Sequence, residues 1–473
     1  MVAIRPFRMK LITAALSATF LSGCATFSQD GGMTAVSQMT EQRTGQAVTR
    51  ASSIDDRDKS AARVADLLKQ PLDPNSTVQI ALLNNQGLQA AFADLGVAES
   101  DYVQAGRLRN PDFSFGRLRG GEGLEIDRSI TFDLIGLLTL PLRSGIEQGR
   151  FEQAKLQAAS VAVQLAADAR RAFFEAVAAQ QSKQYMVQVL GSAQASAELA
   201  RRMARVGNWS KLDLAREQAA YAETIAQVAR ARQEAVAKRE QLTRLLGLWG
   251  RDTAFTLPER LPDLPRAPAE IVDLEAQAMA QRLDLQMARR DADATAKALG
   301  LTRATGFINV LDAGYANKSE TGKPRQNGYE VSVELPIFDW GSAKTAKAEA
   351  LYMQAVSRAA DTAVRARSEV REAYSGYRSR YDIAKHYRDE VIPLRRKISE
   401  EILLRYNGML NSVFELLADA REQTNSVNTA IDAQKDFWIA DTELQGAISG
   451  AGNGAAVRSR TAAMPASTAQ AKH

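Results

Sequence analysis

A single cysteine near the start of the chain is the residue with the clearest chemistry. Cys24 follows a stretch that carries three basic residues and then a short apolar run from Leu11 to Phe20. About ten apolar residues are too few to cross a bilayer as a helix, so this arrangement is typical of a cleaved secretory signal. We predict a signal peptide over residues 1–23.

The residues around Cys24 indicate lipid attachment. Leu21-Ser22-Gly23 places small residues directly before the cysteine, and this resembles a bacterial lipobox, where the new N-terminal cysteine carries lipid. The alternative is a chance buried cysteine. Ala25, and no aspartate, follows Cys24, which resembles the outer-membrane address of bacterial lipoproteins. The expected mature chain is therefore lipid-anchored in the outer membrane, with outer-membrane lipid as a partner.

The other residue types argue against catalysis and metal binding. The chain has one cysteine and two histidines, His386 and His473, which lie far apart, so neither a disulfide nor a His/Cys metal cluster is expected. We find no phosphate-binding glycine loop and no nucleophile elbow. The sequence therefore predicts no enzyme, no metal site and no cofactor other than the lipid on Cys24.

Part of the positive net charge of the chain comes from the predicted signal peptide. The formal net charge is +5. Removing the signal takes away Arg5, Arg8 and Lys10 and no acid, which lowers the charge from +5 to +2. The charge is thus weak support for nucleic-acid binding, and no nucleic-acid partner is expected.

The first half of the mature chain predicts helices around a pair of strands. Residues 24–75 are polar and predict an extended, lipidated N-terminal arm with little core. The first repeat, residues 76–249, then carries apolar periodicities and breaks that predict a helix at 76–105, alternating strands around 113–115 and 130–134, a proline-free long helix at 142–205 and a helix at 211–246.

The same order of predicted helices and strands recurs after a linker with four prolines at 250–268. The second repeat, residues 269–446, predicts a helix at 269–303, strands at 306–316 and 328–335, a long helix at 342–406 and a last helix ending near Gly446. Pro393 is expected to kink the long helix near Glu390. Residues 447–473 predict a disordered tail.

Matching identities support a duplication. Leu88-Gln89 matches Leu285-Gln286, and Pro141 matches Pro336. Gly207 matches Gly408, and the tetrapeptide Ala-Arg-Glu-Gln occurs both at 215–218 and at 420–423. The offset between the halves grows by four residues between the glycine and the tetrapeptide, so the last helix is expected to gain about one turn there.

The strands show the alternation of a barrel wall. Tyr329, Val331, Val333 and Leu335 face one way, while the barrel lumen is expected to receive the alternate residues Glu330, Ser332 and Glu334. The alternative is the surface of a β-sandwich with one wet face. Because four strands are too few to close around a channel, the barrel requires an oligomer, and three copies give twelve strands.

These features together resemble the outer-membrane efflux proteins of the TolC type, over roughly residues 76–446. The resemblance is carried by three segments, namely Asn110-Pro111 before the first strand, Leu335-Pro336-Ile337-Phe338-Asp339-Trp340-Gly341 after the last, and Tyr406-Asn407-Gly408 leading to Leu416-Leu417-Ala418-Asp419-Ala420-Arg421. It implies a mainly α fold in which long helical hairpins form an α-barrel and two strand pairs per chain complete a 12-stranded transmembrane β-barrel in a homotrimer. A periplasmic adaptor protein and an inner-membrane pump are the implied partners.

The resemblance also implies where the functional residues lie. In the family, acidic residues just after the second helix turn ring the narrow periplasmic entrance. Ala418 occupies the place of a frequent aspartate, so the nearest acids, Asp419 and Glu415, are the gate candidates, and an ordinary solvated or ion-paired acid is the alternative. The periplasmic tip and adaptor contact is expected at the turn residues Gly207, Trp209, Gly408 and Leu410, or these pack against the neighbouring hairpin.

The function implied is an outer-membrane exit duct of a tripartite efflux or export system. A periplasmic coiled-coil scaffold or adaptor lipoprotein is the alternative. The strand pair in each repeat favours the duct. The residues do not identify the cargo, because no Met or His cluster points to a metal ion and no other signal points to a drug, an organic acid or a polypeptide.

Overall fold

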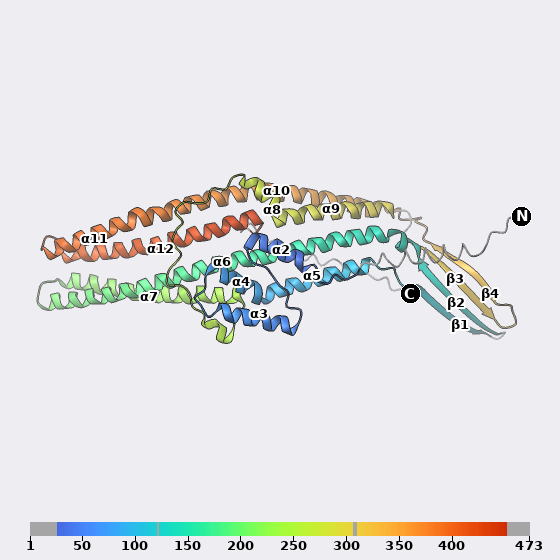
Figure 1. The fold of residues 1–473 in the computed structure, drawn as a ribbon, viewed down its shortest axis with the longest axis horizontal. Helices are drawn as coiled ribbons and strands as arrows, with labels where there is room; N and C mark the ends of the chain where they lie inside the picture. The colour runs from blue at the N-terminus through green and yellow to red at the C-terminus, as the bar shows by residue number, and fades with distance from the viewer. Residues whose placement is uncertain (1–25, 121–122, 306–309, 452–473) are drawn as a thin grey trace. The chain divides into compact units, whose positions relative to one another are not determined.

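The computed structural model describes residues 26–120, 123–305 and 310–451 (Figure 1). Cys24 and His473 lie outside these residues. The described chain is mainly helical with one small sheet. Its elements are α2 (Met33–Thr44), α3 (Ile54–Leu67), α4 (Pro74–Asn84), α5 (Gln86–Ala105), β1 (Asp112–Gly120), β2 (Gly123–Asp133), α6 (Leu134–Arg205), α7 (Lys211–Leu246), η1 (Gly250–Ala254), α8 (Leu274–Gln281), α9 (Leu283–Ala304), β3 (Leu311–Glu320), β4 (Gln326–Val333), α10 (Ser342–His386), η2 (Tyr387–Val391), α11 (Ile392–Asn407) and α12 (Val413–Ser449).

The chain divides into two compact units, and each takes segments from both sequence halves. The described part of the first unit comprises residues 26–36, Ala90–Ala158 and Asp284–Ala363, and it contains the sheet. The described part of the second comprises Ser37–Gln89, Ala159–Leu283 and 364–451, and it contains the helix turns. Within the described residues, no helix is both long enough and apolar enough to cross a membrane.

The sheet of the first unit has the strand order β1-β2-β3-β4, with all neighbours antiparallel. The strands of the two sequence halves therefore join where β2 pairs with β3, for example through Ile130 and Tyr315. The strand pairs were predicted. The predicted end of the third strand at residue 316 was wrong, because β3 continues as far as Glu320. Residues 306–309 of its predicted start lie outside the described residues. The turn between β3 and β4 is short, and Gly322 adopts a left-handed φ of +81° there.

The long helix of the first half begins earlier than predicted. α6 starts at Leu134, directly after β2, and Pro141 lies inside it. The Asp133 carboxylate accepts a hydrogen bond from the Gly136 backbone N–H at 2.6 Å, so it satisfies a donor of the first turn. Pro141 is the eighth residue of α6, beyond the first turn, so it removes one backbone hydrogen bond from the helix interior.

Two predicted helices are each interrupted at a corresponding residue. Asn85 separates α4 from α5, and its side-chain oxygen accepts from the Leu88 backbone N–H at 3.0 Å. Arg282 separates α8 from α9 with the same extended backbone. It is buried, and it donates to Glu369 at 2.7 Å and to the Ala447 carbonyl oxygen at 3.0 Å. These breaks are 197 residues apart, as are Leu88 and Leu285, so they support the predicted duplication.

The expectation of an extended N-terminal segment was wrong. Residues before α4 form α2 and α3, and Ser53 begins α3 with a capping box that includes Asp56. In the second unit, Val48 and Val64 are buried, and the Leu72 backbone N–H donates to the Thr256 carbonyl oxygen at 2.9 Å. The segment therefore packs into that unit although its apolar residues are widely spaced in the sequence.

The core of the second unit includes an aromatic cluster. Phe437 of α12 is buried between Tyr377 and Tyr381 of α10, with ring centroids 5.5 and 5.6 Å apart. The Tyr377 hydroxyl accepts from the Ala269 backbone N–H at 2.9 Å, and the Tyr381 hydroxyl donates to the Arg266 carbonyl oxygen at 2.8 Å. The cluster thereby holds the proline-rich linker against the helices.

The second long helix is interrupted where a kink was predicted, and the kink itself stays a prediction. Between α10 and α11 the chain forms a π-helical turn, η2, which covers Glu390 and ends just before Pro393. Proline lacks the N–H that would continue the α-helical ladder, so the wider turn accommodates it.

Candidate functional site

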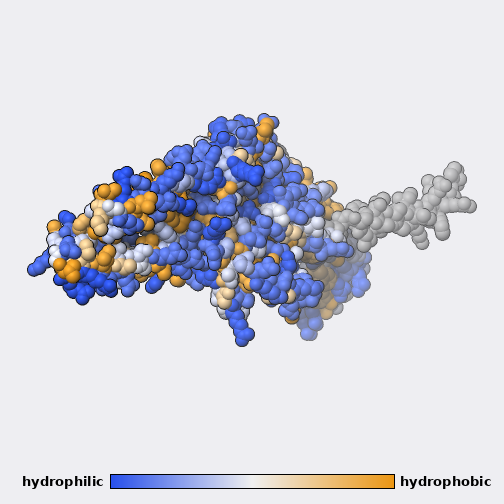
Figure 2. Space-filling model, turned by 60° about the vertical axis from the view of Figure 1, so that its left-hand side comes forward, coloured by the Kyte–Doolittle hydropathy of each residue, from blue (hydrophilic) through white to orange (hydrophobic). Residues whose placement is uncertain are grey.

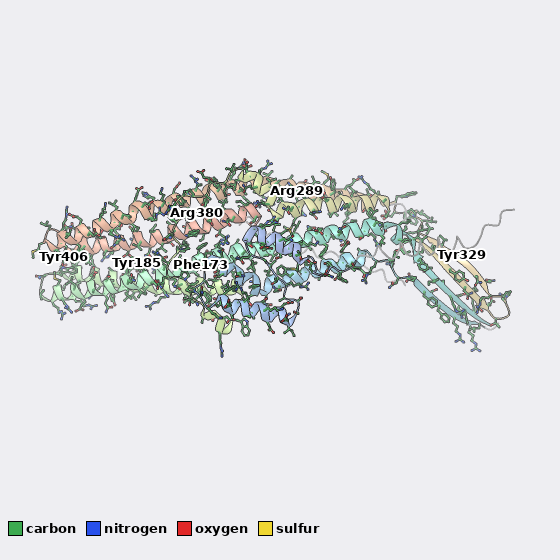
Figure 3. All side chains as sticks on the ribbon, viewed as in Figure 1. Phe173, Tyr185, Arg289, Tyr329, Arg380 and Tyr406 are labelled. Atoms are coloured by element: carbon green, nitrogen blue, oxygen red, sulfur yellow. The ribbon has the colours of Figure 1, made fainter. Side chains whose placement is uncertain are left out.

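One face of the sheet is apolar. Residues paired across antiparallel strands point to the same face, and the register places Phe113, Ile130, Tyr315 and Tyr329 in one row. Tyr329 is 91% exposed and lies on the last strand (Figure 3). We call this the apolar face; its apolar members are Phe113, Phe115, Leu124, Ile126, Ile130, Phe132, Leu311, Ala313, Tyr315, Tyr329, Val331 and Val333.

The opposite face of the sheet is acidic. Its members alternate with those of the apolar face, and Glu330 and Ser332 lie here, as the alternation predicts. Lys318, its only lysine or arginine within the described strands, pairs with Glu125. We call this the acidic face; its carboxylates are Asp112, Glu125, Asp127, Asp133, Asp312, Glu320 and Glu330.

Glu334 follows directly after the last strand. Its backbone N–H donates to the Val310 carbonyl oxygen at 3.2 Å, which continues the pairing of β4 with the chain before β3. Alternation then puts its side chain on the same side as Glu330 and Ser332. That these three residues line a lumen stays a prediction.

The first helix turn has the geometry expected of its glycine. Gly207 adopts a left-handed φ of +83°, and the Asn208 backbone N–H donates to the Met203 carbonyl oxygen at 2.9 Å. Ser210 then caps α7, because its hydroxyl accepts from the Asp213 backbone N–H at 3.1 Å.

In the second helix turn a residue other than glycine adopts the left-handed conformation. Met409, with φ of +61°, takes the left-handed position, whereas Gly408 has φ of −78°. Ser412 caps α12 and forms a capping box with Glu415. Met409 is 202 residues after Gly207, and Ser412 is 202 residues after Ser210. The predicted match of Gly207 with Gly408 was therefore wrong by one residue.

The same comparison corrects the predicted length of the last helix. α7 has 36 residues and α12 has 37, so α12 does not gain a turn. Both helices end at a left-handed glycine, Gly247 and Gly450. The repeated tetrapeptide lies about one turn farther from the capping serine in α12, Ser412, than from the capping serine in α7, Ser210. Its two copies therefore occupy different structural positions.

Apolar side chains are exposed at the helix turns. Met409 is 94% exposed and Leu410 is 78% exposed, and Figure 2 shows hydrophobic residues among the hydrophilic surface of this end. Trp209 is only partly exposed, since its ring stacks on Phe414 with centroids 4.9 Å apart. This contact joins the first turn to the start of α12.

The two gate candidates differ in their surroundings. Glu415 is exposed, and its carboxylate accepts from the Ser412 backbone N–H at 3.3 Å, so it completes the helix cap. Asp419 is 7% exposed, and its carboxylate accepts from the Ser399 hydroxyl of α11 at 2.5 Å. Within one chain, Asp419 thus faces its own hairpin.

Sequence reasoning missed a second buried acid, Glu217 of α7. It lies seven residues after its helix cap, as Asp419 does, and it is also 7% exposed. Its carboxylate accepts from the Arg421 guanidinium of α12 at 3.0 Å. The pair links the two hairpins, and the shared spacing from Ser210 and Ser412 is the signal that could have found it.

A groove of about 350 Å³ lies beside this ion pair. It is lined by residues of α6, α7 and α12, among them Tyr185, Tyr221, Leu417 and Val427. Burial raises the pKa of the Tyr185 hydroxyl, and the residue lies on α6 within the second unit (Figure 3). The hairpins are therefore loosely packed around Glu217 and Arg421.

The fold is that of bacterial outer-membrane channels. The outer membrane channel CmeC of Campylobacter jejuni shares 16% identity over 80% of this chain and 86% of its own, with a TM-score of 0.69. The outer membrane protein VceC of Vibrio cholerae shares 16% identity over 80% and 96%, with a TM-score of 0.67. The open MtrE channel of Neisseria gonorrhoeae shares 16% identity over 81% and 89%, with a TM-score of 0.65.

No family model matches the chain, and no curated protein matches it. The structural likeness confirms the predicted mainly α fold with long helices and a small antiparallel sheet.

Proposed function

We propose that this chain is the outer-membrane exit duct of a tripartite efflux or export system, a passive conduit and not an enzyme. The observation that carries the proposal is the sheet with one exposed apolar face and one acidic face. Such a sheet fits a wall between lipid and water. A periplasmic coiled-coil scaffold would leave the apolar face in water. The shared fold with outer membrane channels supports the same function.

Three copies complete the wall. One chain supplies four strands, and its edge strands β1 and β4 leave backbone donors and acceptors unpaired. In lipid these groups require partners, and a closed barrel provides them. Three chains give twelve strands, with β1 of one chain pairing with β4 of the next. The long helices then continue the conduit as an α-barrel, with the helix turns at its periplasmic entrance.

The proposal includes partners and a lipid anchor. The exposed side chains of Met409 and Leu410 fit a contact with a periplasmic adaptor protein, which connects the duct to an inner-membrane pump. Lipid on Cys24 would fix the chain in the outer membrane. Mass spectrometry of the mature N-terminal peptide tests for lipid on Cys24. A mass equal to that of the unmodified peptide would contradict lipid attachment.

The proposed lumen predicts cation selectivity. The acidic face carries seven carboxylates and one lysine, so a pore lined by it attracts cations. Purified full-length protein in planar bilayers should conduct, with a reversal potential in a KCl gradient that favours K⁺ over Cl⁻. Replacing Asp312 and Glu330 by their amides should lower the permeability ratio about twofold or more, because charged rings set selectivity.

Ser332→Asn is the matched control, since it changes a neutral residue on the same face. It should leave the permeability ratio unchanged. Bilayers that show no conductance with any form of the protein would contradict the duct. Conductance that prefers Cl⁻ would contradict the assignment of the acidic face to the lumen.

A further inference from the structure

Three arginines interrupt the apolar face near the turn between β1 and β2. Arg128 pairs with Phe115, so it shares that face, and Arg117 and Arg119 follow Phe115 at two-residue steps along β1. Arg117 and Arg119 are exposed, and Arg128 is half-buried with one guanidinium nitrogen 3.4 Å from the Asn317 side-chain oxygen. The cluster is therefore positioned by strand register and not by a flexible loop.

The apolar face changes character along the strands. The rows that contain Tyr329, Val331 and Val333 are apolar from strand to strand. In the rows nearer the β1–β2 turn each arginine is paired with one apolar residue, namely Phe115, Ile126 or Leu124. Each step of two residues covers about 6.8 Å, so the arginines occupy a band roughly 13 Å high beside the apolar rows. Long basic side chains next to an apolar belt reach the headgroup level of a bilayer.

The charge of this band is uncompensated within the described strands. All seven strand carboxylates lie on the acidic face, and no described acid lies within ion-pair distance of the Arg117 or Arg119 guanidinium. Three positive charges on one face favour an anion from outside the chain. A guanidinium offers parallel N–H donors that match two oxygens of a phosphate.

We propose that Arg117, Arg119 and Arg128 bind the phosphate of an anionic lipid in the membrane leaflet that surrounds the β1–β2 end of the sheet. The inference rests on the proposed function, because it requires the apolar face to contact lipid. A lipid fits better than a free anion, since the arginines border exposed aromatic side chains of β1, namely Phe113 and Phe115. Acyl chains would cover these side chains while the headgroup meets the guanidinium groups.

The test measures lipid binding to the purified full-length protein by native mass spectrometry. Phosphatidylglycerol, phosphatidylcholine and inorganic phosphate are the probes, and the variants replace all three arginines by glutamine or by lysine. Wild type should bind phosphatidylglycerol at least about tenfold more tightly than the glutamine variant does. The lysine variant should fall between them, because it keeps the charge and loses the paired donors. Phosphatidylcholine should bind all three forms equally weakly.

Two results would overturn the inference. One is affinity of the glutamine variant for phosphatidylglycerol within twofold of wild type. The other is inorganic phosphate that competes at concentrations equal to the lipid, which would assign the site to a free anion. Conductance in bilayers separates this inference from the proposed function. A conducting glutamine variant with unchanged lipid preference defeats only the lipid site, whereas absent conductance in every form of the protein defeats the duct.

Discussion

Arg421→Ala is expected to raise the open probability of the duct by about an order of magnitude. The change leaves the Glu217 carboxylate, which is 7% exposed, without the guanidinium that lies 3.0 Å from it. Leaving a buried acceptor without its hydrogen-bond partner costs about 1–3 kcal/mol. Because this pair links α7 to α12, the loss favours separated hairpins by roughly 5- to 150-fold. Single-channel recording in planar bilayers measures the change as open probability.

The neighbouring arginine provides the control for this prediction. Arg216 is also exposed, but its partner Asp213, 3.6 Å away, belongs to the same helix. Arg216→Ala should therefore leave the open probability unchanged. The charge swap that combines Arg421→Glu with Glu217→Arg should restore most of the closure. Equal open probability of wild type and Arg421→Ala would show that this ion pair does not hold the entrance closed.

Val331→Lys is expected to destabilise the membrane-inserted protein, whereas Ser332→Lys is not. Val331 lies on the apolar face and is 65% exposed, and the next residue lies on the acidic face. A lysine on the lipid face near the middle of a bilayer costs about 2–4 kcal/mol, and a lumen residue is tolerated. Unfolding by urea in lipid vesicles, followed by tryptophan fluorescence, measures both variants. Equal destabilisation by the two lysines would contradict the assignment of the faces.

The faces of the sheet could be predicted because the information is local. Side chains of a strand alternate with a period of two, so the order Tyr329-Glu330-Val331-Ser332-Val333 already separates an apolar from a polar side. The prediction needed no knowledge of the neighbouring strands. The bounds of β3 were harder, because Asn317 to Glu320 are polar and belong to the strand through pairing with β2 and, at Asn317 and Lys318, with β4.

The contacts of the N-terminal segment and of the helix turns are not local. Val48 and Val64 are buried by residues distant in the sequence, and their spacing fits no single period. Glu217 and Arg421 are 204 residues apart, so their ion pair could not be predicted from one sequence. The capping serines Ser210 and Ser412 could have aligned the two hairpins, whereas the repeated tetrapeptide misled the alignment.

The mass of the native particle tests the central claim most directly. The mature, acylated protein would be extracted from outer membranes in mild detergent, and its mass measured by light scattering with the detergent contribution subtracted. Three chains per particle are expected, because four strands per chain complete a twelve-stranded wall only in a trimer. A stable monomer or dimer would contradict the closed duct and would favour a periplasmic scaffold.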